Sequence, residues 1–392
     1  MISFENSEVA FHHFSYSDLH KTYRLFKLMS SSVLVKVGKL LLNAAILIKL
    51  PISWMLKPTI FKQFCGGETL DEASKTIEFL KKYNVKAILD YSVEGDESEL
   101  SFDKALNETL ATINFAKMNK EEVPFTVFKP SAFGRRKILG KISSHENLSE
   151  SELQEFEKFK ARIEIICKKA FESDVPVMID AEHYYYQPII DIVCENMMEQ
   201  FNQKKAIVYN TLQMYRTDRL DFLNKSLKKA DEKGYFLGIK FVRGAYMEKE
   251  RARALLHGYS SPIHPDKPST DHDFDAAISF SVENINKISI FCGTHNEKSN
   301  LALAKKMEEK GISKDDPRIW FSQLYGMSDN ISFNLSHEGY NVAKYIPYGP
   351  IKQVLPYLIR RAEENTSVKG QTSRELSLIR KEINRRKNSA KG

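Results

Sequence analysis

Cysteine, tryptophan and long uncharged runs are scarce in this sequence of 392 residues. The four cysteines, Cys65, Cys167, Cys194 and Cys292, form no CxxC pair, which argues against a zinc ribbon and against a disulfide framework. No run of about 20 clean apolar residues offers a membrane-spanning helix. No G-x-G-x-x-G motif follows the first expected strand, which excludes a Rossmann cofactor domain. The N-terminus has neither a signal peptide nor an Arg-rich transit pattern, so we expect no export or import and a reducing compartment.

Apolar and aromatic residues are plentiful. Hydrophobic residues make up 42% of the chain, with 24 Phe and 17 Tyr, which is enough to build a large core and argues against disorder. The net charge of +7 gathers partly in RKEINRRKNSAKG, from Arg380 onward, where we expect a solvated basic tail. No aromatic-interleaved RNA-binding pattern or zinc finger accompanies the charge, so nucleic acid is not an expected partner.

Short β-rich runs alternate with amphipathic stretches eight times, which is typical of parallel βα units. The expected strands are 85–89, 125–128, 175–179, 206–212, 235–242, 288–292, 319–322 and 341–346. Eight units predict an α/β fold, a (β/α)8 TIM-type barrel with additional N-terminal helices. The predicted organisation is a helical region over 1–84, the barrel over 85–368 and a basic tail over 369–392.

The stretch from 33 to 56, VLVKVGKLLLNAAILIKLPISWML, is apolar but interrupted by lysines and Pro51. It has two interpretations. It forms an amphipathic helix packed on the barrel, or it lies on a bilayer surface. The sequence alone does not choose between them.

Polar residues follow most of the expected strands, where the active site of this fold forms. They are Lys129, Asp180, Gln213, Arg243, Thr294 with His295, and Gln323, and Tyr345 lies near the end of the eighth strand. Lys129 and Asp180 form either a structural ion pair or part of a site. No second His or Cys stands at ligand spacing from His295, so we expect no metal.

The last helical stretch places Tyr357, Arg360, Arg361 and Glu364 on one face, at i, i+3, i+4 and i+7. The opposite stripe, from Ile351 to Ala362, is apolar. A charged face is often merely solvated, whereas two adjacent arginines are also suited to clamping a carboxylate through bidentate hydrogen bonds.

Seven segments resemble, in this order, the successive strand-end motifs of proline dehydrogenases: VFKPSAF, MIDAE, NTLQMY, KFVRGAYMEKER, CGTHNEKS, FSQLYGM and YIPYGPIKQVLPYLIRRAEEN. The resemblance runs from about Gly67 to Val368. VRGAY and the Y-x(11)-Y-xx-RR arrangement are its most specific parts. The resemblance implies a monofunctional, FAD-dependent enzyme that oxidises L-proline to 1-pyrroline-5-carboxylate.

The resemblance also implies a role for each matching residue. Arg360 and Arg361 pair with the proline carboxylate, Lys129 reaches toward it, and Tyr345 and Tyr357 pack against the proline ring. Asp180 and Arg243 are the implied catalytic residues, with Arg243 near the flavin N5, where a positive group stabilises the reduced ring. A structural salt bridge is the alternative for Arg243. The implied FAD-binding residues are Gln213, Val242, Arg243, Ala245, Thr294, His295, Asn296 and Gln323.

The resemblance further implies that a quinone takes the electrons onward, with peripheral membrane contact through residues 33–56 or the basic tail. The expected location is a bacterial cytoplasm, peripheral on the inner membrane, or a mitochondrion if the source is eukaryotic. One alternative is a hydroxyproline dehydrogenase, but those enzymes carry a smaller residue at the position of Tyr345. The other is a barrel lyase in which Lys129 forms a Schiff base. The proline after Lys129 departs from the family pattern and leaves the aim of Lys129 open.

Overall fold

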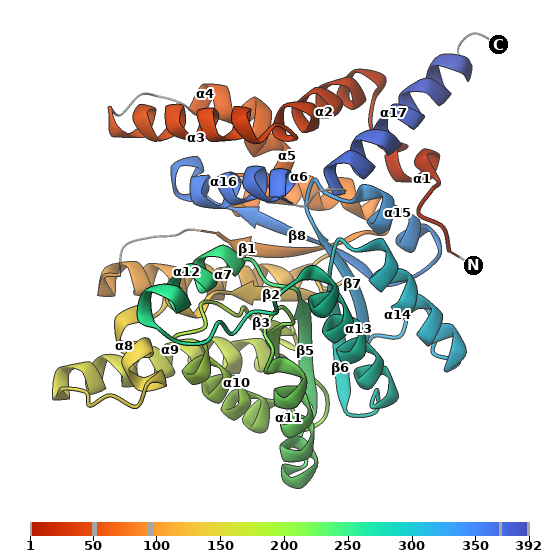
Figure 1. The fold of residues 1–392 in the computed structure, drawn as a ribbon. Helices are drawn as coiled ribbons and strands as arrows, with labels where there is room; N and C mark the ends of the chain where they lie inside the picture. The colour runs from red at the N-terminus through yellow and green to blue at the C-terminus, as the bar shows by residue number, and fades with distance from the viewer. Residues whose placement is uncertain (1, 49–52, 93–96, 368–370, 390–392) are drawn as a thin grey trace. The chain divides into compact units, whose positions relative to one another are not determined.

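A computed structural model of the chain describes residues 2–48, 53–92, 97–367 and 371–389. Eight strands follow one another into a closed barrel (Figure 1). They are β1 Lys86–Tyr91, β2 Phe125–Phe128, β3 Val177–Ile179, β4 Val208–Gln213, β5 Leu237–Val242, β6 Ile288–Gly293, β7 Ile319–Leu324 and β8 Val342–Tyr348. The predicted (β/α)8 fold is therefore confirmed, and each expected strand overlaps an observed one.

The burial of the strands explains why they read as apolar runs rather than as alternating ones. All six residues of β4 and all seven of β8 are buried, as parallel strands covered on both faces should be. The neighbouring strands from β1 to β7 pair in parallel register, for example Ile239 of β5 with Ile290 of β6.

The helices begin and end at clear local signals. Ser149 and Glu152 form a reciprocal capping box at the start of α9, and Gly234 adopts a positive φ at the end of α11. The α-helices are α1 Ser7–Phe11, α2 Tyr16–Met29, α3 Ser32–Leu47, α4 Ser53–Leu56, α5 Lys62–Phe64, α6 Leu70–Lys81, α7 Glu99–Met118, α8 Arg136–Ser143, α9 Glu150–Ser173, α10 Gln187–Phe201, α11 Arg219–Lys233, α12 Met247–His257, α13 Lys267–Glu283, α14 Glu297–Glu309, α15 Asp329–His337, α16 Ile351–Ser367 and α17 Gln371–Ser389. A π-helical turn, η1, spans Lys57–Phe61, and a 3₁₀ turn, η2, spans Pro130–Ala132.

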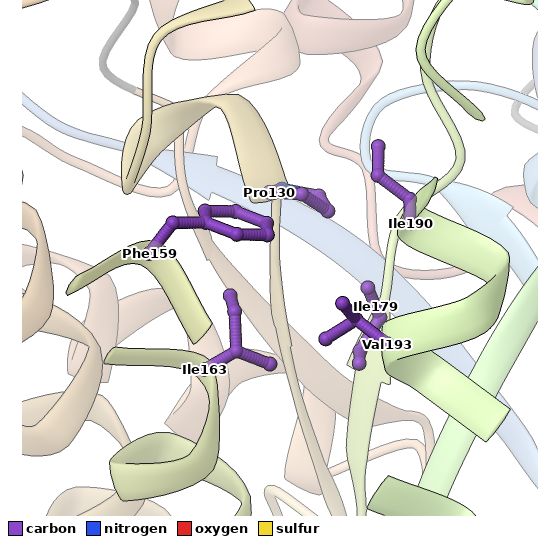
Figure 2. A pocket seen from close by; sticks show the side chains of 6 residues that line it. All are labelled: Pro130, Phe159, Ile163, Ile179, Ile190 and Val193. Carbon is purple, nitrogen blue, oxygen red and sulfur yellow. The ribbon is translucent and has the colours of Figure 1, made fainter. Parts of the chain in front are cut away.

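The chain divides into two compact units, each described by itself. One unit contains residues 86–91 and 95–322, from β1 to most of β7. Within it, α9, α10, α11 and α13 flank the strands β3 to β6 (Figure 1). Figure 2 shows the apolar layer that joins this helical shell to the strands: Phe159 and Ile163 of α9 and Ile190 and Val193 of α10 gather around Pro130 and Ile179.

The other unit contains residues 1–85, 92–94 and 323–392, with the terminal helices and β8. Its core joins the two ends of the chain, since Leu19 and Phe26 of α2 pack in one cluster with Val354 of α16 and Leu378 of α17. Helix α17 differs from the expected solvated tail, because Leu378 and Ile379 are each 1% exposed. Among the described helices, none is both long enough and apolar enough to cross a bilayer.

Candidate active site

Lys129 and Asp180, both half-buried, lie in one network of charged residues with Asp90 and Lys240. The Nζ of Lys129 lies 2.8 Å from Oδ2 of Asp90 and 3.9 Å from Oδ2 of Asp180. The Nζ of Lys240 lies 2.6 Å from the other carboxylate oxygen of Asp180. Each ammonium thus faces a carboxylate, and such pairing is the condition under which buried charges are tolerated.

Asp90 and Lys240 are members of this network that the sequence analysis did not identify. Each sits inside a strand, in β1 and β5, and each is at most 5% exposed. The available signal was a charged residue within an otherwise apolar strand, because such a side chain must meet a partner of opposite charge. Spacing does not reveal which partner that is.

The loop after β2 is fixed directly after Lys129, by Pro130 and Ser131. The ring of Pro130 is buried in the apolar layer shown in Figure 2, and Pro130 begins the η2 turn. Ser131 donates from its backbone N–H and its hydroxyl to the two carboxylate oxygens of Glu182, at 2.7 and 2.6 Å. Burial raises the pKa of Glu182, while these bonds from Ser131 act to lower it. Pro130 therefore anchors the turn that follows Lys129, and the side chain of Lys129 is directed toward Asp90.

Arg243, directly after β5, is held by four groups. Its guanidinium donates to Asp271 Oδ1 at 2.7 Å, to Thr294 Oγ1 at 2.6 Å and to Ser299 Oγ at 2.9 Å. It also lies over the ring of Phe274, 4.3 Å from the centroid. Burial opposes ionisation of Asp271, but hydrogen bonds from Lys267 and Arg243 hold its pKa below the ordinary value. The structure thus brings Arg243 and Thr294 together, and these contacts hold the positively charged guanidinium in one position.

The residues after β6 organise the start of α14. Asn296 caps this helix by accepting from the backbone N–H groups of Lys298 and Ser299. Its own N–H donates to Oγ1 of Thr294 at 3.1 Å. His295 is half-buried between the two. The side-chain oxygen of Asn296 is used by the helix cap, so its expected contribution to a cofactor site rests on its remaining groups.

Gln213, the last residue of β4, is 3% exposed and has an unsatisfied acceptor. Its Nε2 lies 3.5 Å from the carbonyl oxygen of Ala181, whereas its Oε1 is buried and has no hydrogen-bond partner. Nearby along the barrel, Val242 ends β5 and Ala245 is exposed. Between them, Gly244 has φ of +126°, and a Cβ there would lie 2.6 Å from the ring of Tyr215. Only glycine fits this approach.

The remaining expected residues belong to the unit that contains β8. Gln323, on β7, accepts through Oε1 from the hydroxyl of Ser332 at 2.7 Å. Tyr345, on β8, is 7% exposed, and its carbonyl accepts from Tyr325 N–H.

On α16, Tyr357 and Arg361 are buried, with the Arg361 guanidinium 5.0 Å from the centre of the Tyr357 ring. Arg360 is half-buried beside them in sequence. The predicted apolar stripe of this helix is confirmed, since Ile351, Val354, Leu355 and Leu358 are buried. The side chain of Glu364 lies outside the described part of the chain.

The chemistry that these groups support is limited by what surrounds them. Lys129 contacts two carboxylates, whereas a Schiff-base lysine needs neighbours that favour its neutral amine. Burial raises the pKa of the Cys292 thiol to about 12, which makes it a poor nucleophile. What remains is a set of fixed cations and polar groups suited to binding and orienting an anionic substrate and to stabilising negative charge.

Comparison with known proteins supplies the family. The model of the family described as Proline dehydrogenase matches residues 73–374. Proline dehydrogenase 2, mitochondrial, of Arabidopsis thaliana is 33% identical over 374 residues, which cover 85% of this chain and 79% of that protein. The carbapenem antibiotics biosynthesis protein CarD of Pectobacterium carotovorum subsp. carotovorum is 36% identical over 324 residues, covering 82% of this chain and 83% of that protein.

A solved structure agrees in fold. Proline utilization A (PutA) from Bdellovibrio bacteriovorus, inactivated by N-propargylglycine, superposes with a TM-score of 0.71 over 93% of this chain at 20% identity. This chain spans 38% of the length of that protein.

Proposed function

Because this chain belongs to the proline dehydrogenase family, we propose that it oxidises L-proline to 1-pyrroline-5-carboxylate with bound FAD, and that the residues predicted from the sequence form its site. Bound FAD would supply the acceptor for the hydride that leaves C5 of proline. Arg360 and Arg361 hold the substrate carboxylate, and Tyr345 and Tyr357 pack against its ring. Asp180 and Lys129, fixed by Lys240 and Asp90, form the polar wall.

One observation carries the cofactor assignment. The buried Oε1 of Gln213 has no partner among the described residues, and leaving such an acceptor unsatisfied costs about 1–3 kcal/mol. A donor on a bound molecule removes this cost. Arg243 is fixed as a cation by Asp271, so its charge can stabilise an electron-rich ring without rearrangement. Thr294, His295, Asn296, Gln323, Val242 and Ala245 complete the proposed FAD set.

The amine of proline must lose a proton before or during hydride loss. Among the strand-end residues that the structure describes, none is placed as an evident general base, so the proton passes to solvent. Tyr345 favours proline over hydroxyproline, since the resemblance associates hydroxyproline with a smaller residue at this position.

Proline-dependent reduction of a soluble dye, with the product trapped by o-aminobenzaldehyde, tests the assignment. L-Proline should be oxidised and D-proline should not. A chain that holds FAD but reduces no dye with L-proline would contradict it.

We also propose that α3 and α4 rest on an anionic bilayer. Leu40 and Trp54 are 71% and 76% exposed. Between residues 19 and 67 the sequence has eight basic residues and no Asp or Glu: Lys21, Arg24, Lys27, Lys36, Lys39, Lys49, Lys57 and Lys62. Lys21, Lys39 and Lys57 pair with Asp18, Glu363 and Glu68, so the attraction rests on the other basic residues, each of which contributes about 1 kcal/mol near an anionic surface. The predicted peripheral membrane contact rests on this surface, whereas the predicted compartment, a bacterial cytoplasm or a mitochondrion if the source is eukaryotic, rests on the sequence.

Flotation with anionic vesicles tests this contact. The parent chain should float, the double variant Leu40→Glu with Trp54→Glu should not, and Leu256→Glu, at an 80% exposed leucine of α12, should behave as the parent. Absence of flotation by the parent chain would remove the proposal.

A further inference from the structure

Helix α12 is attached to its unit through a carboxylate rather than through an apolar face. Of its eleven residues, Glu250 and Ala254 are the ones that are buried, at 0% and 2% exposed. The leucines beside them, Leu255 and Leu256, are 86% and 80% exposed. Because acidic side chains are almost never fully buried without a partner, the contacts of Glu250 determine what this helix is attached to.

Glu250 binds the loop that follows β3. Its Oε1 lies 2.7 Å from Nδ1 of His183 and accepts from the backbone N–H of Tyr184 at 3.2 Å. The imidazole of His183 also lies against the ring of Tyr246, with 4.4 Å between the ring centroids. Since Tyr246 precedes α12 directly and Glu250 follows it by four residues, the loop contacts the start of this helix at two points one turn apart.

The second carboxylate oxygen shows that stability alone does not explain an acid at this position. Oε2 of Glu250 is buried and has no hydrogen-bond partner among the described residues, which is unfavourable for the fold. Replacing both partners of such a contact with apolar side chains is often neutral or stabilising. The pair of His183 and Glu250 therefore fixes one relative position of two segments, at some expense of stability.

The two segments flank one of the residues proposed to bind FAD. Strand β4 lies between β3 and β5 in the barrel, and Gln213 is its last residue. On the β3 side, Nε2 of Gln213 lies 3.5 Å from the carbonyl oxygen of Ala181, two residues before His183. On the β5 side, the N–H of Tyr215 donates to the carbonyl oxygen of Arg243 at 2.8 Å. A bond between the β3 loop and α12 thus holds both neighbours of Gln213 in place.

We propose that Glu250 is a positioning residue for the flavin site. By holding His183, it fixes the loop after β3 and the segment from Arg243 to Tyr246 on either side of Gln213. It acts through these segments and not on the reacting atoms. This inference rests on the proposed function. Because a site whose parts are held in advance binds its ligand with less loss of conformational freedom, breaking the contact should weaken the retention of FAD.

Three variants and one control separate this role from a structural one. Glu250→Leu removes the acceptor, whereas Glu250→Gln keeps an acceptor oxygen for both donors without the charge. The double variant His183→Leu with Glu250→Leu replaces both partners with apolar side chains, so that no imidazole is left unpaired. The control is Glu195→Leu on α10, since Glu195 also accepts from two donors, Ser226 at 2.9 Å and Lys229 at 2.8 Å, but joins α10 to α11 in the helical shell.

Two of the measurements do not depend on activity. The rate of FAD release follows from the rise in flavin fluorescence after dilution of the loaded chain. Hydrogen–deuterium exchange of residues 243–257, compared with that of α11, reports local opening of the segment that Glu250 holds. Steady-state reduction of a soluble dye with L-proline then gives kcat per bound FAD and the KM for L-proline.

In Glu250→Leu, FAD release should be at least about tenfold faster and kcat per bound FAD about tenfold lower, with the KM for L-proline within about twofold of the parent. The KM should change little because the arginines proposed to hold the carboxylate belong to α16. Exchange of residues 243–257 should accelerate while that of α11 stays unchanged. Glu250→Gln and Glu195→Leu should match the parent in all three assays. The double variant should resist urea better than Glu250→Leu but release FAD equally fast.

Parent-like FAD release and exchange in a folded Glu250→Leu would overturn the inference. A double variant that regains the FAD release of the parent would also overturn it, because the unpaired imidazole would then be the cause. If Glu250→Leu does not fold, His183→Leu, at a side chain that is 23% exposed, removes the same contact from the loop side and replaces it. Failure of the proposed function is distinct, because the parent chain itself would then hold no FAD or leave L-proline unoxidised.

Discussion

The ammonium of Lys240 lies 2.6 Å from Asp180, on the carboxylate oxygen opposite the one that faces Lys129. Asp180 therefore has a lysine on each side, and Asp90 takes the stronger contact with Lys129. This arrangement makes Asp180 part of a fixed wall rather than a mobile acid or base. We propose that Asp180 holds the geometry of the site in the proposed reaction.

Breaking this pair should be costly. Lys240→Met removes the ammonium that lies 2.6 Å from the Asp180 carboxylate, and loss of one partner of a buried pair costs about 3–5 kcal/mol. Urea unfolding should show this loss, together with lower proline turnover. The control Lys233→Met breaks an equally short but exposed pair with Glu199 and should cost at most about 1 kcal/mol. Equal losses in the two variants would contradict the role given to Lys240.

The arginines of α16 should set the affinity for proline. Arg361→Lys keeps the positive charge but loses the planar fork that binds a carboxylate bidentately, so the KM for L-proline should rise roughly 10- to 100-fold. Steady-state dye reduction measures this. Arg380→Lys is the control, because Arg380 of α17 also lies over a tyrosine, Tyr23, at 5.6 Å, but outside the proposed site. If Arg361→Lys had the same KM for L-proline as the control, the proposed role of Arg361 in binding the carboxylate would be wrong.

Gly244 should be required for cofactor retention. Gly244→Ala places a Cβ against the Tyr215 ring at a φ of +126°, so we expect a loss of about 2 kcal/mol or more and a lower FAD content per chain. Gly258 also has a positive φ, but a Cβ at this position would meet no atom within 4 Å. It therefore separates the effect of backbone strain from the effect of a clash with Tyr215. Gly258→Ala should cost about 1 kcal/mol and retain FAD, as measured by absorbance after gel filtration. Full FAD content in Gly244→Ala would contradict this prediction.

Glu375 should make stability depend on pH. Burial and the charge of Asp329 raise its pKa to about 8, although Lys344 and the Ser328 N–H act to lower it. Between about pH 4.5 and 8 the folded chain holds a proton that the unfolded chain has released, so the free energy of unfolding falls as pH rises through this window.

Glu375→Gln removes this dependence, because glutamine stays neutral and keeps an acceptor for the Ser328 N–H. Relative to the parent, the variant should be about equally stable near pH 4.5 and more stable, on the order of 5 kcal/mol, near pH 8.5. Thermal unfolding at both pH values measures the difference. Parallel stability curves for parent and variant would show that Glu375 is already ionised in the folded chain.

The sequence predicts the barrel well because its signal is local. Each strand is a short apolar run between turn residues, and parallel strands buried on both faces give that pattern. Candidate residues such as Lys129 and Arg243 follow from their place after a strand. Asp90 and Lys240 do not, because their orientation depends on strand register and barrel closure, which bring together residues far apart in the sequence.

Helix α17 shows a different limit. The basic residues from Arg380 onward suggest a solvated tail, yet Ile379 and Ile383 are buried and Arg386 donates to the carbonyl oxygens of Phe11 and Phe14. The N-terminal partner that receives this helix is distant in sequence. The basic residues therefore predicted a solvated tail, because the short apolar stripe of α17 can be recognised as buried only once its N-terminal partner is known.

The visible spectrum of the purified chain, recorded anaerobically before and after addition of L-proline, tests the central claim most directly. The account predicts a flavin band that L-proline bleaches and that stays unbleached at the same proline concentration in Arg360→Ala and Arg361→Ala. A flavin band indifferent to L-proline in the parent chain would contradict the assigned substrate, and a chain that takes up no added FAD would contradict the assigned reaction.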